Sequence, residues 1–295
     1  MKQTMKRLVT FGLAVAMTAV LLPATVVHAA TKSVTMYKGE AFYYTDYGKV
    51  SKASSSNSKV VKVAKDKENE RHTNLTAKST GKATATIKTS YGTTKLNITV
   101  KKLDFTAKAV SIAGGYVTLS VKNKTSQTFD KIEVSYTFKD ANGEIVKQDT
   151  ELVSRIPAKK TVYTGIYVGS SQAELLDLAS CTAKVTAVAH DPSYLYKDVS
   201  SKVKATIKDE TDNGNNITFS VTTKNTTSQR VTGYNYIMIY DANGTLIGVD
   251  KMSIYLDKKA TNTSTSGYIS KYSYPDYDHF KIVTQAYYTV RDKNW

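Results

Sequence analysis

Cysteine, proline and tryptophan are scarce in this sequence of 295 residues, with one, four and one copies respectively. Because Cys181 is the single cysteine, no disulfide can form within the chain, which excludes the disulfide frameworks of small domains exported by animal cells. The scarcity of proline excludes long Pro-rich linkers between domains. Each domain must therefore be stabilised by a hydrophobic core, for which 41% of the residues are apolar.

Tyrosine is abundant in contrast, with 21 copies against seven phenylalanines. Together with the many valines and threonines it favours β-strands, because branched and aromatic side chains fit a pleated, half-buried surface. The chain length is typical of two domains or of three small ones.

The first 29 residues have the pattern of a secretory signal peptide. Three basic residues precede an apolar run from Leu8 to Leu22, and small residues at positions 27–29 precede the expected cleavage point at Ala30. The alternative is a membrane anchor, but the apolar run is shorter than the ~20 residues of a comfortable span. Since no second run of that length follows, we expect no membrane span in the mature chain.

The expected mature chain carries no sign of covalent attachment to the cell. No cysteine follows the signal pattern to accept a lipid, and the segment from Val290 to Trp295 has neither a hydrophobic tail nor a sorting-type motif. We therefore expect a secreted, extracellular protein, either released or held at the cell wall by non-covalent contacts. The absence of disulfides favours a bacterial exporter, and among bacteria a Gram-positive one.

Positive charge dominates the chain. The formal net charge is +16, or +13 once the three basic residues of the signal pattern are removed. Such a field favours anionic partners, which outside a bacterial cell are wall polymers, glycans or surface proteins. The alternative is an ordinary solvated surface, because the lysines are distributed along the chain. No nucleic-acid motif accompanies them, so no nucleic-acid partner is expected.

Residues 30–102 form a first block of short alternating segments. Val60–Val63, Ala83–Ile87 and Leu96–Val100 each alternate apolar with polar residues, which is the period-2 pattern of half-buried strands. Turns containing serine or glycine separate these segments.

Two copies of one unit occupy the rest of the chain. The segments Ile132–Gly143 and Gly233–Gly244 each run an alternating strand into Asp-Ala-Asn-Gly, 101 residues apart. An Asn-x-Thr-Ser-Gln segment lies upstream of the strand in both copies. A period near 100 residues with several short strands in each copy is typical of an Ig-like or fibronectin-like sandwich.

We therefore predict an all-β protein, with three tandem Ig-like or fibronectin-like β-sandwiches after an N-terminal signal peptide. The expected boundaries are 1–29 for the signal peptide, 30–102 for the first sandwich, 103–203 for the second and 204–295 for the third. A single short helix is expected at 171–178, where a glutamate and leucines follow a serine.

The Asp-Ala-Asn-Gly segments have two interpretations. Asparagine and aspartate tolerate left-handed backbone angles and glycine prefers them, so each segment can close a β-hairpin. The alternative is a calcium loop, in which positions 1, 3, 5 and 12 would be taken by Asp140, Asn142, Glu144 and Glu151. The glycine falls at position 4 instead of 6, and the second copy lacks the two glutamates. We therefore predict turns and no metal site.

Three segments of the first block, Ser55–Val61, Leu75–Ile87 and Leu96–Val100, stand in the order found in the bacterial Ig-like group 2 domain, which this block resembles. The family occurs in invasin- and intimin-like surface proteins, so the resemblance implies a small β-sandwich with an adhesion or spacer role. The polar insertion from Asp66 to Thr73 departs from the family pattern. The two later units resemble FxLYD-type and fibronectin-like extracellular sandwiches, and none of these families implies catalytic residues.

Residues with catalytic or metal-binding chemistry are few and dispersed. His72, His190 and His279 fall one in each block without metal-ligand spacing. Cys181 could act as a nucleophile with His190 as its base, but the alternating strand beside it favours a buried structural cysteine. No phosphate loop, nucleophile elbow or nucleotide fingerprint is present. We predict no enzyme activity, catalytic residue, metal or cofactor.

Tyrosines crowd the last block. Tyr268, Tyr272, Tyr274 and Tyr277 are the candidate ligand-binding residues, and acidic side chains lie among them. A platform of tyrosines beside acids can stack on sugar rings or hold a peptide. The alternative is that half of these tyrosines fill the core and the others scatter over the surface.

The sequence thus predicts an exported, non-enzymatic binding, adhesion or spacer protein of the cell surface or wall. The alternative is a carbohydrate-binding module protein that recognises wall or environmental glycans. Sandwiches in a row separate their ends and present loops and edge strands to partners, and the addition of a partner strand to such an edge is one mode of binding.

Overall fold

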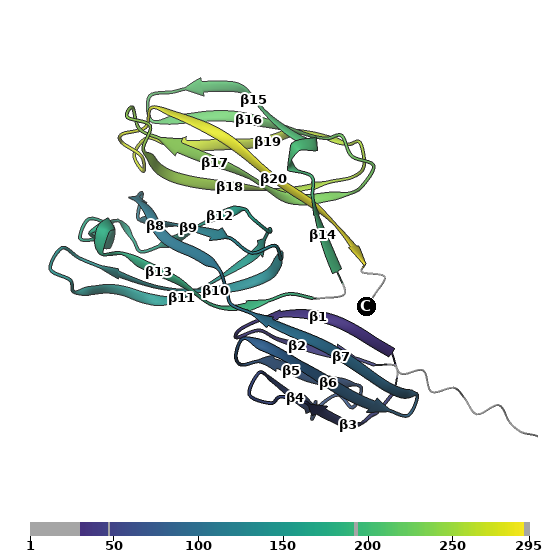
Figure 1. The fold of residues 1–295 in the computed structure, drawn as a ribbon. Helices are drawn as coiled ribbons and strands as arrows, with labels where there is room; N and C mark the ends of the chain where they lie inside the picture. Colours follow the sequence, from purple (N-terminus) through teal and green to yellow (C-terminus); the bar gives the residue numbers. More distant parts are fainter. Residues whose placement is uncertain (1–29, 47, 192–193, 292–295) are drawn as a thin grey trace, which may run out of the picture.

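Three β-sandwiches follow one another along the chain (Figure 1). The computed structural model describes residues 30–46, 48–191 and 194–291, so the expected signal peptide lies outside the described residues. The fold is all-β, with Ig-like or fibronectin-like sandwiches in tandem, as predicted. Across this described part of the chain, no helix has the length and apolarity that a membrane span requires.

The first sandwich packs a four-stranded sheet on a three-stranded one. The larger sheet, in the order β1-β7-β6-β3, contains β1 (Ala30–Tyr37), β7 (Gly92–Lys101), β6 (Gly81–Thr89) and β3 (Val50–Ser55). The smaller, in the order β2-β5-β4, contains β2 (Ala41–Thr45), β5 (His72–Ala77) and β4 (Val61–Lys65). The inward-facing Leu75, Ile87 and Leu96 are completely buried, which follows from the alternation of side chains along a strand.

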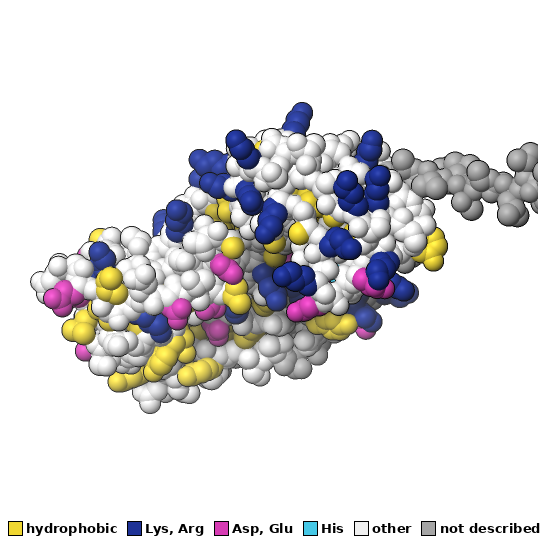
Figure 2. All heavy atoms as spheres, turned by 90° about the horizontal axis from the view of Figure 1, so that it is seen from below, with side chains coloured by type: hydrophobic (Ala, Val, Ile, Leu, Met, Phe, Trp, Pro, Cys, Tyr) yellow, Lys and Arg dark blue, Asp and Glu magenta, His cyan; other side chains and the backbone are white. Residues whose placement is uncertain are grey.

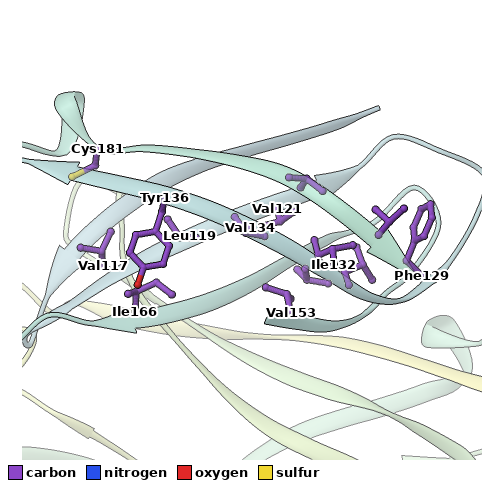
Figure 3. Close-up of a cluster of buried hydrophobic side chains, with 14 of the residues drawn as sticks. Val117, Leu119, Val121, Phe129, Ile132, Val134, Tyr136, Val153, Ile166 and Cys181 are labelled. Carbon is purple, nitrogen blue, oxygen red and sulfur yellow. The ribbon is translucent and has the colours of Figure 1, made fainter. Parts of the chain in front are cut away.

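The second sandwich is built from one six-stranded sheet that folds over its own core. In the order β11-β10-β13-β8-β9-β12, its strands are β11 (Ile145–Ile156), β10 (Phe129–Lys139), β13 (Thr182–Ala189), β8 (Phe105–Ala113), β9 (Tyr116–Asn123) and β12 (Thr161–Tyr167). Side chains from both layers meet between them, including Leu119, Phe129 and Val134 (Figure 3). Strands β13 and β8 connect the two layers through a single pair, Thr182 with Lys108.

The third sandwich again packs four strands on three. The larger sheet, in the order β14-β20-β17-β18, contains β14 (Tyr194–Asp198), β20 (His279–Arg291), β17 (Val231–Tyr240) and β18 (Leu246–Leu256). The smaller sheet contains β15 (Val203–Asp212), β16 (Asn216–Asn225) and β19 (Thr261–Ser270). Strand β14 precedes the expected boundary at residue 204 and pairs with β20 of the third sandwich from Tyr194 to Asp198.

A buried asparagine closes one end of the second sandwich. The Nδ2 of Asn123 donates to the carbonyl oxygens of Gln127 at 2.8 Å and Pro157 at 3.1 Å, and its Oδ1 accepts from the backbone N–H of Thr125 at 2.9 Å. The side chain is completely buried, and burial is tolerable because both ends of the amide are paired. Asn123 therefore ties the end of β9 to the following loop and to the end of β11.

The third sandwich repeats this clamp. The Nδ2 of Asn225 donates to the carbonyl oxygens of Gln229 and Asp257, both at 2.8 Å, while its Oδ1 accepts from the backbone N–H of Thr227 at 2.9 Å. The repeated Asn-x-Thr-Ser-Gln segment is thus a structural device that positions one loop in each sandwich.

The Asp-Ala-Asn-Gly segments close β-hairpins, as predicted. The Oδ1 of Asp140 accepts from the backbone N–H of Asn142 at 2.9 Å and of Glu144 at 2.8 Å. Asp241 makes the equivalent bonds in the third sandwich. Gly143 has a φ of 84°, the left-handed region that glycine enters most readily.

The expected helix at 171–178 is shorter and divided. The structure has α1 (Ser170–Ala173) and a 3₁₀ turn, η1 (Leu178–Ser180). Asp177 accounts for the division, because its Oδ1 accepts from the backbone N–H of Ala179 at 3.2 Å and starts a new turn there. A second 3₁₀ turn, η2 (Ser200–Lys202), precedes β15.

A buried carboxylate joins the first sandwich to the second. Glu40 is completely buried, and its Oε1 accepts from the backbone N–H of His190 at 3.1 Å and contacts Nδ1 of the same residue. The Oε2 of Glu40 accepts from the backbone N–H of Tyr37 at 2.9 Å. The Tyr37 ring enters the core of the second sandwich and meets Phe129 edge-on, with ring centroids 5.1 Å apart.

The second sandwich and the third share an apolar contact. Strand β17 is buried along nearly its whole length, because Ile237 and Ile239 face the core of the third sandwich while Tyr236 and Met238 pack against the second. Burial on both faces explains why the last five residues of β17, Tyr236–Tyr240, are apolar without interruption. Residues of the second sandwich therefore contact a strand that lies more than 60 positions later in the sequence.

Replacement of Asn225 tests the clamp. Asn225→Ala removes both carbonyl bonds and leaves the buried backbone N–H of Thr227 without its acceptor, so we expect a loss of about 3 kcal/mol in the free energy of unfolding. Ser228→Ala, a change at an exposed position of the same loop, is the matched control and is expected to lie within about 0.5 kcal/mol of the parent. Urea unfolding followed by circular dichroism measures both, and equal losses would contradict the clamp.

Candidate functional site

A cleft of about 490 Å³ lies between the second and third sandwiches. We call it the tyrosine cleft, because Tyr116, Tyr163, Tyr268 and Tyr274 contribute to its walls. The first two come from β9 and β12 of the second sandwich, Tyr268 from β19, and Tyr274 from the loop between β19 and β20. Residues more than 150 positions apart in the sequence therefore line one surface.

Two glycines, Gly248 and Gly114, allow the loop between β19 and β20 to lie close to its neighbours in the cleft. A Cβ on Gly248 would lie 2.2 Å from Cε1 of Tyr274, so only a glycine leaves room for the tyrosine ring at this point of β18. A Cβ on Gly114 would lie 2.8 Å from the side chain of Ser273, across the boundary between the two sandwiches. Gly114 also has a φ of 57°, which other residues rarely adopt.

Two tyrosines of the cleft are open to solvent. Tyr116 is 45% exposed and Tyr268 is 62% exposed. Tyr116 is supported from behind by Tyr167, with ring centroids 5.1 Å apart and planes tilted by 58°. A ring with a packed partner on one side and solvent on the other offers a rigid apolar surface to a ligand, with little conformational entropy left to lose.

Charged groups lie beside these rings. Glu151 of β11 is half-buried in the cleft wall, and Asp250 and Lys251 of β18 line the opposite side. The Asp250 carboxylate accepts from the backbone N–H of Lys251 at 2.7 Å, while the Lys251 ammonium lies 5.6 Å from the centre of the Tyr234 ring. The cleft thus combines two carboxylate acceptors with one ammonium donor.

Contacts behind the cleft hold the two sandwiches together. The Tyr163 and Tyr236 rings meet edge-on at 5.7 Å, and the Nε2 of Gln285 donates to the carbonyl oxygen of Thr161 at 2.5 Å. Burial raises the pKa of both Tyr163 and Tyr236. Because these rings are packed and desolvated, the walls of the cleft are held in place before any ligand binds.

The structure separates the four tyrosines singled out from the sequence. Tyr268 and Tyr274 line the cleft, whereas Tyr272 is 91% exposed and does not contribute to its walls. Tyr277 packs against the core of the third sandwich, where burial raises its pKa. Burial, followed by the negative charge of Asp250, also raises the pKa of Tyr274. The Tyr274 ring therefore lines the cleft and also packs against the core of the third sandwich.

Sequence reasoning missed Tyr116 and Asp250, and it considered Glu151 only as a ligand of a calcium loop. Tyr116 follows the pair Gly114-Gly115, a turn signal that places it at the start of a strand. No local pattern connects these three residues, since they come from β9, β11 and β18 and meet through the packing of two sandwiches.

The other chemically interesting residues do not converge. Cys181 is buried at the beginning of β13, where burial raises the pKa of its thiol, and His190 lies just after the end of the same strand. An extended strand of that length places them roughly 30 Å apart, so His190 cannot serve Cys181 as a base. In the part of the chain that the structure describes, no three His, Cys, Asp or Glu side chains group to hold a metal ion.

No protein family matches the chain, and no curated protein is similar to it. Among solved structures, the transglutaminase of red sea bream is 12% identical with a TM-score of 0.20, over 71% of this chain and 36% of that chain. The I9–I11 tandem from titin is 13% identical with a TM-score of 0.22, over 80% of this chain and 95% of that chain. A tetra-tandem repeat in the extending region of a large adhesion protein is 10% identical with a TM-score of 0.20, over 89% and 74%.

Scores of this size carry no functional information, so any function must follow from the residues of this chain. The comparisons support no enzymatic function for this chain.

The contact between Gly248 and Tyr274 predicts an observable change in ionisation. Gly248→Ala forces the Tyr274 ring away from β18 into solvent, so the pKa of Tyr274 should fall towards its ordinary value as burial is lost. Titration of ¹³C-labelled tyrosines by NMR measures this pKa. Tyr277 is the internal control, because its pKa is raised by burial elsewhere and should stay unchanged. An unaltered Tyr274 would show that the ring does not depend on the glycine.

Proposed function

We propose that this protein is an exported, non-enzymatic binding protein whose tyrosine cleft holds a carbohydrate. The observation that carries the proposal is the pair of solvent-open rings, Tyr116 and Tyr268, beside the carboxylates of Glu151 and Asp250. A sugar has apolar C–H faces and a rim of hydroxyl groups. Aromatic rings match the faces, and a few placed polar groups match the rim, which is the usual construction of a small-molecule site.

The polar groups suit a neutral or cationic sugar better than an acidic one. Hydroxyl groups can donate to the carboxylates of Glu151 and Asp250, while the Lys251 ammonium can donate to a ring or glycosidic oxygen. A volume of about 490 Å³ lies in the range of small-ligand sites. The ligand class that fits is a short oligosaccharide of the wall or of the environment.

Export and location at the wall are parts of the same proposal. The signal-peptide pattern in residues 1–29 supports export, and the net charge of +13 on the remaining chain supports retention by anionic wall polymers. We further propose that the first sandwich is a bacterial Ig-like group 2 domain. The first matching segment spans the connection from β3 to β4, and the other two supply parts of β5, β6 and β7. The polar insertion covers the loop between β4 and β5 and the first two residues of β5.

A glycan array probed with residues 30–295 tests the carbohydrate proposal. The double variant Tyr116→Ala with Tyr268→Ala removes both open rings, and we expect binding to weaken roughly tenfold or more. Tyr272→Ala is the matched control, because this tyrosine is 91% exposed and lies outside the cleft walls. Binding that survives the double variant, or that Tyr272→Ala removes, would reject the cleft as the carbohydrate site.

A second candidate function is adhesion to polyanions through the first sandwich. Residues 30–102 contain 15 basic and five acidic side chains, a net charge of +10, so most of the positive charge of the mature chain belongs to this sandwich. Figure 2 shows lysine and arginine side chains gathered mainly over the first sandwich, at the right of the view. A surface of this kind attracts wall polymers over a distance of about one Debye length.

Binding to isolated Gram-positive cell walls measures this adhesion. A triple variant that changes Lys52, Lys82 and Lys95 to Glu should bind at least about tenfold more weakly, because these exposed lysines belong to the first sandwich. The matched control changes the exposed Lys204, Lys208 and Lys258 of the third sandwich to Glu and alters the total charge equally. Equal losses in the two variants would show that total charge, and not the first sandwich, drives adhesion.

A further inference from the structure

A second hollow, of about 800 Å³, lies between the first and second sandwiches. We call it the junction groove. Its sides are the segments Phe105–Ala107 of β8 and Ala183–Thr186 of β13, and one end is closed by Lys38, Gly39, Ala77 and Lys78 of the first sandwich. The connection from β7 to β8 contributes Lys102 and Leu103. The groove is separate from the tyrosine cleft, with which it shares no lining residue.

Each side of the groove is a strand edge. Strand β8 pairs with β9 from Phe105 onwards, and β13 pairs with β10 along most of its length. Between β8 and β13, however, the described residues form one pair, Thr182 with Lys108. From that pair towards the first sandwich, both strands turn an unpaired edge to the groove. Such edges are templates for an added strand.

The side chains of the two strands create an apolar floor. Phe105, Ala107 and Ala183 are half-buried and Val185 is buried, and all four pack against the core of the second sandwich. Their neighbours in the sequence are exposed, including Thr106. An occupant in extended conformation would match this arrangement, because alternate side chains would point to the floor and to solvent.

The rim of the groove is basic. Lys38, Lys78, Lys102 and Lys184 are all exposed, and no acidic residue is among the lining residues that the structure describes. Three of these lysines belong to the strongly basic residues 30–102. The solvent-facing side chains of the occupant should therefore be acidic.

The third sandwich shows a filled edge of the same kind. Strand β20, the counterpart of β13 in the repeat, pairs with β17 on one edge and with β14 on the other. Strand β14 meets the end of β20, from Tyr287 to Arg291, whereas the groove lies alongside the middle of β13. The chain supplies β14 from the connection before the third sandwich. The connection before the second sandwich has only residues 102–104 between β7 and β8, too few to supply a strand.

We infer that the junction groove binds an extended peptide segment of a partner protein, with alternating apolar and acidic side chains, as an added β-strand. The backbone of the segment would pair with the edge of β13 beyond Thr182, where β8 and β13 are no longer paired, its apolar side chains would cover the floor, and its acidic side chains would face the four lysines. An anionic amphiphile would use the floor and the lysines but would leave both strand edges unpaired.

Fluorescence polarisation with labelled peptides tests this inference on residues 30–295. The probe is a five-residue peptide with both ends capped that alternates valine with glutamate, because the sides of the groove are only three and four residues long. A second peptide of the same sequence carries N-methyl groups on alternate amides, which removes the N–H donors of one edge. A third replaces glutamate by lysine. We expect the first peptide to bind and each of the other two to bind at least tenfold more weakly.

Protein variants locate the binding. Lys38→Glu with Lys184→Glu should weaken binding of the valine–glutamate peptide at least tenfold, and Lys224→Glu with Lys258→Glu, a pair of exposed lysines in the third sandwich, should leave it unchanged. Thermal unfolding followed by circular dichroism checks that both variants are folded. The variant Tyr116→Ala with Tyr268→Ala should keep peptide binding, so that this result and the carbohydrate result are independent.

Three outcomes would overturn the inference. The first is absence of binding by the valine–glutamate peptide. The second is equal binding of the N-methylated peptide, which would show that strand pairing plays no part. The third is displacement of the peptide by sodium dodecanoate, with unchanged affinity for the peptide in the Lys38 and Lys184 variant, which would identify an apolar site for amphiphiles.

Discussion

The contact between Glu40 and His190 is the interaction on which the arrangement of the first two sandwiches depends. A chain with one cysteine cannot join its domains by disulfides, so their mutual positions must come from buried non-covalent contacts. A completely buried carboxylate is tolerated only where it is paired, and Glu40 is paired with groups of both sandwiches. This contact holds the first sandwich at the end of the junction groove, next to Gly39 and Lys38.

The second and third sandwiches are also held together by buried non-covalent contacts, but these contacts are mainly apolar. There the contact is made by aromatic and apolar side chains of β17, with Tyr236 and Met238 packed against the second sandwich. The tyrosine cleft and the junction groove both arise where neighbouring sandwiches meet. A binding role for this protein therefore rests on the junctions, and the sandwiches serve to position them. The positive charge is also distributed unevenly, because the first sandwich is far more positive than the other two.

The comparison of the sequence with the structure shows where local reasoning succeeds. The period-2 segments form strands, and the Asp-Ala-Asn-Gly segments close hairpins because the aspartate caps its own turn. The Asn-x-Thr-Ser-Gln segments indicated a repeat in the sequence. The role of Asn123 and Asn225 as buried clamps could not be predicted, because each donates to a carbonyl oxygen more than 30 positions away. The four candidate tyrosines could not be sorted from the sequence, because the alternation that predicts burial fails in the loop that carries Tyr272 and Tyr274.

The sequence by itself determined the all-β class, the tandem repeat and the excess of positive charge, because these depend on composition and on patterns within a few residues. The tertiary structure decided that β17 is covered on both faces, that Cys181 and His190 lie at opposite ends of one strand, and that Tyr116 and Tyr268 line the same cleft. The physical reason is the same in each case. Side-chain alternation predicts that one face of a strand is buried. Which surface covers that face depends on residues that are distant in the sequence and meet only when the domains pack.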